Sequence, residues 1–266
     1  MNAYFTVLFT VIVSDLIAVA ALLLTRRFVN LEKLRSSHDV GGFLIAIVGT
    51  LYAVLLGLIV VDAMQQYQHA REITERETNY LTDVFVLAKG LTEPRSSQLQ
   101  RMCTSYVDQV VDTEWDQMRA GTFCPIARQK AIDLMSSLMD FDPKTEREKA
   151  IYPQLVNEAS QFWQNRQERI SITKKGIPPV EWLVLIVGAI ITIFFTYFFA
   201  LEQTRLQAIM TAMVATLISL NLALLLLFAY PFSGDLSVQS EAFRSIGEIF
   251  RNFHAENAGA IEKTHS

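Results

Sequence analysis

The residue types that could carry catalysis are scattered along this chain. Its four histidines, His38, His69, His254 and His265, stand in no HExxH motif and beside no nucleophile motif. The glycines form neither a GxGxxG nor a Walker loop, and the two cysteines, Cys103 and Cys124, lack CxxC spacing and cannot form a zinc site alone. We therefore predict that the chain is not an enzyme and has no metal site or cofactor.

The two cysteines leave two alternatives open. They are either two buried thiols or one structural disulfide, Cys103 to Cys124. The compartment decides between them, because disulfides persist in oxidising surroundings.

Charged residues gather in two places without forming a recognisable site. The first group is Arg71, Glu72, Glu75, Arg76 and Glu77, for which a solvated helical face with salt bridges is favoured over an acidic site. The second group is Glu114-Trp115 with Arg166 and Arg169, residues that are more typical of helix packing and ion pairs than of a specific site.

Four apolar spans indicate the elements that must position any site. They are residues 3–25, 43–61, 180–200 and 208–230, each long enough to cross a hydrocarbon core of about 30 Å at about 1.5 Å per residue. Asp15 lies within the first span and Asn221 within the fourth. Such polar groups should face protein or water rather than lipid: Asp15 either has a function or bonds a neighbouring helix.

Composition agrees with a membrane protein that has a sizeable polar part. Of the 266 residues, 51% are hydrophobic and 19% are charged, and the mean hydropathy is +0.27. The net charge of −4 and the lack of a basic run with aromatics argue against nucleic acid as a partner. We expect membrane lipids and inorganic ions as its surroundings and partners.

The polar region between the second and third spans has helical periodicity and no strand pattern. Breaks near Glu93-Pro94, 121–125 and 141–143 predict three further amphipathic helices after the long second helix, which should continue past the membrane surface along a stripe from Ile73 to Leu91. The predicted fold is all-α, with four transmembrane helices and a helical extramembrane domain inserted between the second and third. The segments are 1–62, 63–179, 180–230 and a tail, 231–266, whose polar end from Ala255 should fray.

One face of the second span could line a pore. Thr50, Val54 and Leu58 fall at i, i+4 and i+8, and Asp62 continues the row at the membrane boundary. A ring of such residues around a symmetry axis would form a narrow apolar constriction with carboxylates at its mouth. Alternatively, the same face contacts lipid or neighbouring helices.

Connector charges predict the orientation in the membrane. The short connectors carry five basic residues, Arg26, Arg27, Lys33, Arg35 and Arg205, and the positive-inside rule makes them cytoplasmic. Lys174 and Lys175 argue the other way, but long translocated domains are largely exempt from the rule. In the inner membrane of a bacterium the domain and both termini would then be periplasmic, with a cytoplasmic location as the alternative.

The second span and its surroundings resemble the bestrophin-like family, a domain of unknown function distantly similar to bestrophin anion channels. The resemblance rests on Gly49, on Leu56-Gly57-Leu58 with Arg71 thirteen residues later, on Glu114-Trp115, Pro178 and Trp182, and on Pro231-Phe232-Ser233-Gly234-Asp235. It implies a homo-oligomer, a pentamer in bestrophins, with Thr50, Val54 and Leu58 at the pore neck, and it implies anions and a cytosolic domain. No acidic run follows Asp235, so calcium gating is not inferred.

The sequence therefore predicts an oligomeric ion channel or channel-like protein whose second transmembrane helix lines the pore. The alternative is a non-conducting membrane scaffold or sensor whose extramembrane helices bind a partner. Asp62 favours cations and the resemblance favours anions, so the ion stays open.

Overall fold

The computed structural model of the protein describes residues 3–28, 38–173, 176–198, 203–234 and 236–264, and within these ranges it is helical without strands. Its long helices are α1 (Ala3–Phe28), α3 (His38–Leu87), α4 (Arg95–Gln109), α6 (Pro125–Met139), α7 (Glu146–Thr173), α8 (Pro179–Tyr197), α9 (Thr204–Phe228) and α10 (Glu241–Thr264). Three short ones complete the order: η1 (Ala88–Gly90), the π-helix η2 (Val110–Glu114) and α5 (Trp115–Arg119).

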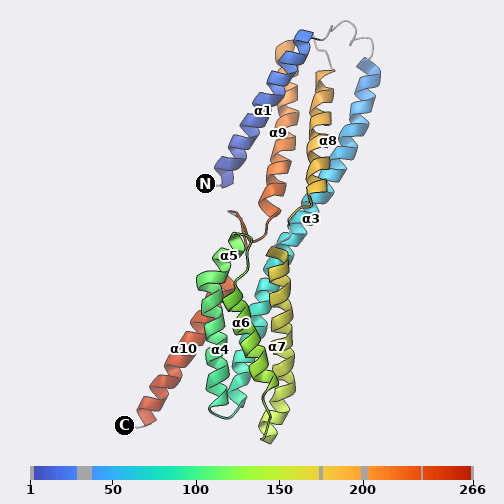
Figure 1. Ribbon diagram of the computed structural model, residues 1–266. Helices are drawn as coiled ribbons and strands as arrows, with labels where there is room; N and C mark the ends of the chain where they lie inside the picture. The colour runs from blue at the N-terminus through green and yellow to red at the C-terminus, as the bar shows by residue number, and fades with distance from the viewer. Residues whose placement is uncertain (1–2, 29–37, 174–175, 199–202, 235, 265–266) are drawn as a thin grey trace. The chain divides into compact units, whose positions relative to one another are not determined.

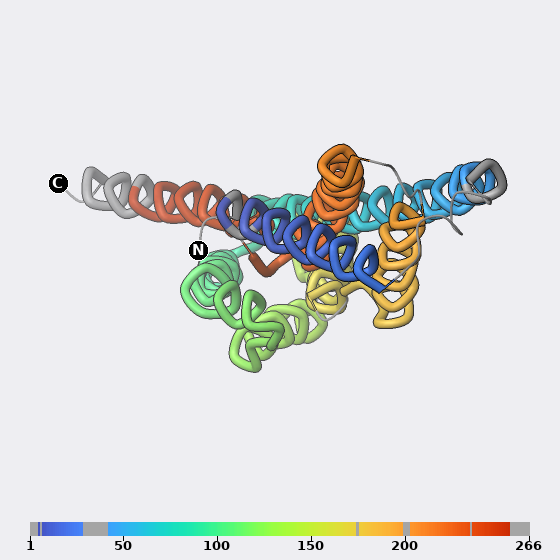
Figure 2. Tube along the Cα trace, turned by 90° about the horizontal axis from the view of Figure 1, so that it is seen from above, coloured from blue at the N-terminus to red at the C-terminus, as the bar shows by residue number. Residues whose placement is uncertain are grey.

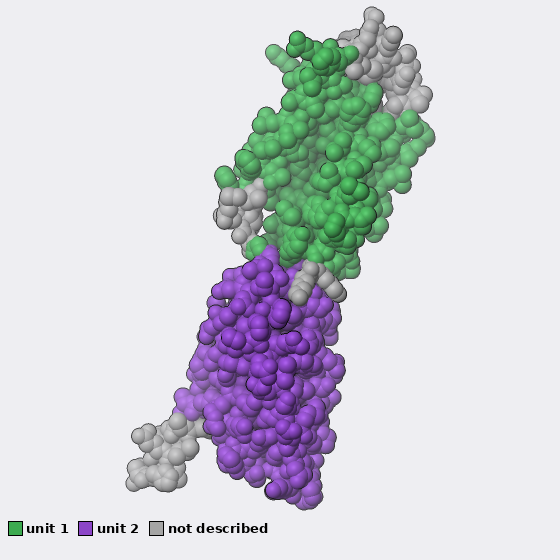
Figure 3. Space-filling model, viewed as in Figure 1, with its two compact units in different colours: residues 1–67, 176–230, 234–236 green, residues 68–175, 231–233, 237–266 purple. Residues whose placement is uncertain are grey.

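The chain forms two compact units (Figure 3). Unit 1 comprises residues 1–67, 176–230 and 234–236, and unit 2 comprises residues 68–175, 231–233 and 237–266. Helix α3 contributes its first part to unit 1 and its second part to unit 2, and the prediction that it runs on without a break is confirmed by its length of 50 residues.

Four of the described helices are long and apolar enough to cross a membrane, and unit 1 contains α1, α8, α9 and the first part of α3. Helix α1 packs along α9 and also contacts α8, as Figures 1 and 2 show from two sides. A second contact joins α3 to α8, where Tyr52 donates a hydrogen bond of 3.1 Å to the Leu185 carbonyl. Gly188 makes this approach possible, since a β-carbon there would lie 2.4 Å from the Tyr52 ring.

Unit 2 is built from the second part of α3 and from α4, α6, α7 and α10 (Figure 1). Helix α4 packs against α6 and α10, and α6 also contacts α7. The helix breaks confirm the sequence prediction, because the three helical runs 95–119, 125–139 and 146–173 are separated at the expected places.

The tail contains a helix that the sequence analysis did not predict, since residues 241–264 form α10. That the polar end from Ala255 frays stays a prediction. Phe243, Ile246 and Phe250 recur on one face of α10 and are buried, and Phe250 stacks on Phe85 of α3 with ring centroids 4.0 Å apart. The connector residues Lys33 and Arg35, together with Lys174, Lys175, Asp235 and His265, lie outside the described residues.

Candidate functional site

The predicted pore row lies on the face of α3 that the described part of the chain leaves uncovered. Val54 is 57% exposed and Leu58 is 65% exposed, and Thr50 and Asp62 are also exposed. The Thr50 hydroxyl donates to the Ala46 carbonyl at 2.7 Å, so the backbone of α3 itself satisfies that hydroxyl. Asp62 accepts a hydrogen bond of 2.7 Å from the Gln66 amide one turn further on.

The opposite face of α3 is occupied. Tyr52, Leu56, Val60 and Ala63 are buried there, in a cluster that includes Leu185 of α8 and Ile218 of α9. Residues two apart on a helix point to nearly opposite sides, so burial of Tyr52 and Leu56 turns Thr50, Val54 and Leu58 outward. The row is therefore available for contact with lipid, with another chain, or with water.

The two intramembrane polar residues are placed differently. The Asp15 carboxylate accepts a hydrogen bond of 2.7 Å from the Thr216 hydroxyl of α9, and its other oxygen is buried with no partner among the described atoms. This is the helix-to-helix bond that the sequence left open as one alternative. Asn221 donates to the Leu217 carbonyl of its own helix at 2.8 Å, and no bond from its side chain to another helix is found among the described residues.

Both cysteines are free, buried thiols. Of the two alternatives left open by the sequence, the structure has the buried thiols and not the disulfide. Cys124 caps α6, where its sulfur accepts from the Ala127 backbone N–H at 3.5 Å. Burial raises the pKa of the Cys103 thiol. A thiol in that state is a small apolar core residue rather than a nucleophile.

A cluster of buried charges forms the interior of unit 2. We call it the buried ion network and define it by five side chains: Glu77 of α3, Tyr106 of α4, Glu114 of η2, and Arg166 and Arg169 of α7. Two carboxylates and two guanidiniums balance each other, and no member is more than 3% exposed. An unbalanced charge at this depth would be costly, so neutrality is a condition for the packing.

The hydrogen bonds of the network link all four elements. Arg166 binds both oxygens of Glu114, at 2.8 Å and 2.7 Å. Arg169 donates to Glu77 at 2.6 Å and to Glu114 at 3.1 Å. Tyr106 donates to Glu77 at 2.5 Å and accepts from Arg166 at 2.8 Å.

The pKa shifts follow from this arrangement. Burial alone would raise the pKa of Glu114, but the charges of Arg169 and then Arg166 hold it below its usual value. Burial, and then the charge of Glu77, raise the pKa of Tyr106, which therefore stays a neutral donor. The network is a fixed structural linkage of α3, α4, η2 and α7 rather than a set of groups poised for proton transfer.

The residues next to the network hold the segment that follows α9. Trp115 donates a hydrogen bond of 3.2 Å to the Val238 carbonyl and packs edge-on against Phe232. Ser233 donates to the Arg119 carbonyl at 2.8 Å. Glu114-Trp115 and the Pro231 segment, far apart in sequence, are thus parts of one packed region of unit 2.

Sequence reasoning missed the depth of this network. The exposed pairs Arg71 with Glu75 and Arg76 with Glu72 confirm the predicted solvated face, but Glu77 is an exception because it is fully buried. Glu77 lies four residues after Ile73 and seven before Val84, on the apolar stripe of the same helix. An acid that continues an apolar stripe was the available signal, as were Arg166 and Arg169 in line with Phe162.

Fold and site together define a multi-pass, all-helical integral membrane protein with a second, more polar helical unit. The family model of the Bestrophin-like domain matches residues 12–243, and the chain belongs to that family. No curated protein matches the chain.

Solved structures share the fold. A bacterial bestrophin homologue from Klebsiella pneumoniae is similar with a TM-score of 0.65 at 12% identity, over 94% of this chain and 97% of that one. Two variants of a membrane protein are similar with TM-scores of 0.65 and 0.63 at 10% and 13% identity, over 92% and 93% of this chain and 97% and 96% of theirs. At such identities the likeness establishes the fold alone.

Proposed function

We propose that the protein is an oligomeric ion channel whose pore is lined by α3. The observation that carries this proposal is the uncovered row Thr50, Val54, Leu58 and Asp62, on a helix whose opposite face packs against α8 and α9. Membership of the Bestrophin-like family supports it, as does the likeness to a bacterial bestrophin homologue.

The mechanism requires no chemistry. Copies of α3 around a shared axis, five by analogy with bestrophins, would place Val54 and Leu58 at a narrow apolar neck that conducts when wetted and closes when dry. Asp62 would add a ring of carboxylates at the end of the neck, and such a ring favours cations. The resemblance to bestrophins favours anions instead. Because the two arguments disagree, the sign of the conducted ion has to be measured.

The orientation belongs to the same proposal. Unit 2 would lie outside the bilayer and, by the charges of Arg26, Arg27 and Arg205, in the periplasm of a bacterial cell whose inner membrane holds unit 1. A cytoplasmic unit 2 is the alternative.

Purified protein in planar bilayers tests the channel. Leu58→Ala should raise the current, because a smaller apolar side chain widens the neck and eases its wetting. Leu217→Ala is the matched control: Leu217 lies on α9 and is 65% exposed, as is Leu58, and its truncation should leave the current unchanged. Reversal potentials in a salt gradient report the ion, and Asp62→Asn should shift them toward anions.

Absence of current in both the wild type and Leu58→Ala, with protein confirmed in the bilayer, would contradict the channel. The non-conducting scaffold or sensor would then be the function to pursue.

A further inference from the structure

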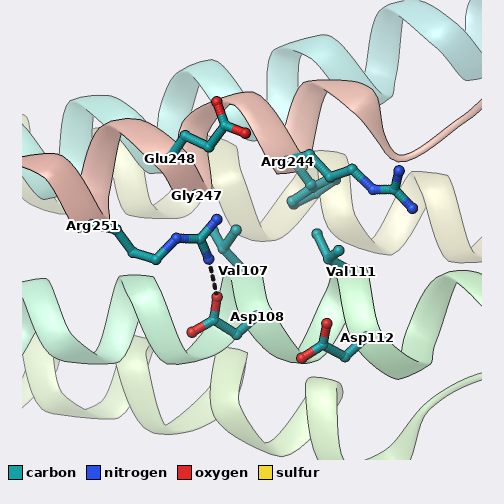
Figure 4. A pocket seen from close by; sticks show the side chains of 9 residues that line it. Val107, Asp108, Val111, Asp112, Arg244, Gly247, Glu248 and Arg251 are labelled. Carbon is teal, nitrogen blue, oxygen red and sulfur yellow. Dashed lines mark hydrogen bonds and ion pairs between the residues drawn. The ribbon is translucent and has the colours of Figure 1, made fainter.

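A groove crosses unit 2 between α10 and the joined helices α4 and η2. It has a volume of about 370 Å³ and is lined by Val107, Asp108, Val111, Asp112, Phe243, Arg244, Gly247, Glu248 and Arg251. Figure 4 shows the two walls running antiparallel, with Asp108 and Asp112 on the α4–η2 side and Arg244, Glu248 and Arg251 on the α10 side. The volume is at the lower end of the range typical of small-molecule sites.

The floor of the groove is apolar. Val107 is 1% exposed and Phe243 is fully buried, and Val111 lies one turn after Val107 on the same wall. Gly247 is buried, and a β-carbon there would lie 3.1 Å from Val107 Cγ1, so the backbone of α10 packs closely against Val107 at this point. Val111 is half-buried, so its side chain is the apolar surface that a ligand in the groove could contact.

The two ends of the groove differ in their charges. At one end Arg251 crosses to Asp108 with an N–O distance of 3.1 Å, and the charges satisfy each other. At the other end Arg244 and Asp112 stand on opposite walls, and neither side chain has a hydrogen-bond or ion-pair partner among the described residues (Figure 4). The charges at the second end are therefore free to bind a ligand, whereas those at the first end are paired with each other.

The open end has the chemistry of a site for a dipolar ion. A purely anionic ligand would be repelled by Asp112 and Glu248, and a purely cationic ligand would be repelled by Arg244. A ligand with one carboxylate and one ammonium satisfies both walls, because guanidinium–carboxylate and ammonium–carboxylate bonds are among the stronger hydrogen bonds of proteins. The residues that form a metal site are absent, since the described part of the chain has no group of acids, histidines or cysteines able to hold an ion.

The backbone supplies a second observation. Val111 and Asp112 belong to the π-helix η2, a single wide turn inserted after α4. Such turns are rare and occur frequently at functional sites. This one directs Glu114 into the buried ion network while Asp112 remains exposed at the groove.

We propose that this groove binds a small zwitterion with an apolar side chain, of the class of apolar α-amino acids. The carboxylate would bind Arg244, the ammonium would bind Asp112, and the side chain would lie on Val111. The site lies within unit 2 and does not rest on the proposed channel, so each can fail without the other.

Binding of L-leucine to the full-length protein in detergent, measured by equilibrium dialysis, tests the site. We expect saturable binding, with about tenfold or greater weakening in Arg244→Gln and in Asp112→Asn. Leucinamide, which lacks the carboxylate, and 4-methylpentanoate, which lacks the ammonium, should bind at least about tenfold more weakly than L-leucine.

Matched controls separate the groove from general charge effects. Arg128→Gln and Asp140→Asn remove the same charges at exposed positions of unit 2 outside the groove, and they should bind L-leucine as the wild type does. All four positions are exposed, so circular dichroism should show folded variants. Failure of L-leucine to saturate the wild type, or equal affinity in Arg244→Gln and Asp112→Asn, would overturn the proposal.

Discussion

Glu77 and Arg169 show how a residue's neighbours decide what its charge does. On the same helix, the pairs of Glu72 and Glu75 with arginines are half exposed and contribute little, whereas Glu77 and Arg169 are fully buried and 2.6 Å apart. Removing one partner of such a buried pair leaves the other charge uncompensated. The network should therefore be a strong determinant of the stability of unit 2.

Arg169→Met should lower the free energy of unfolding by about 3–5 kcal/mol, because Glu77 and Glu114 would each lose a donor in the interior. Arg71→Met removes the same charge from an exposed pair and should change stability by less than about 1 kcal/mol. Chemical unfolding of the detergent-solubilised protein, followed by circular dichroism, gives both values. Equal effects of the two substitutions would show that the buried network is not a stability determinant.

Periodicity was sufficient to predict the elements but not their burial. The spacing of apolar residues predicted the four spans and the continuous helix α3. The breaks at Pro94, Gly121 and Pro143 predicted the three helical runs of unit 2. Helix α10 was not predicted, although Phe243, Ile246 and Phe250 recur at helical spacing. The π-helix η2 was not predicted, since an extra residue in one turn leaves no mark in the spacing of apolar residues.

The contact of α8 with α3 depends on the absence of a side chain at one position. Gly188→Ala should weaken this packing by about 1–3 kcal/mol, because the new methyl would lie 2.4 Å from the Tyr52 ring. Gly49→Ala is the control, since no atom lies within 4 Å of a β-carbon there and alanine favours helix. Thermal unfolding in detergent compares the two, and a Gly188→Ala protein as stable as Gly49→Ala would contradict the packing described for α3 and α8.

For the whole molecule, the side of the membrane is the property that sequence and resemblance predict differently. Connector charge puts unit 2 in the periplasm, and the resemblance to bestrophins puts it in the cytosol. Neither follows from the helices themselves, because an all-helical bundle has the same internal contacts in both orientations.

Gln98→Cys decides the orientation. Gln98 is exposed on α4, while the native Cys103 and Cys124 are buried and should not react. A membrane-impermeant thiol reagent should label the variant in intact bacterial cells if unit 2 is periplasmic. Labelling only after the membrane is opened would place unit 2 in the cytoplasm, and the wild type should stay unlabelled in both cases.

The central claim is that the uncovered row of α3 faces a shared axis, and disulfide formation between copies tests it most directly. Leu58→Cys in membranes should form intermolecular disulfides under mild oxidation, because an axial position brings the copies within reach of one another, and an odd-numbered ring should leave one copy unpaired. Leu217→Cys, equally exposed but on α9, should remain monomeric on a non-reducing gel. Cross-linking through Leu217→Cys with none through Leu58→Cys would contradict the account.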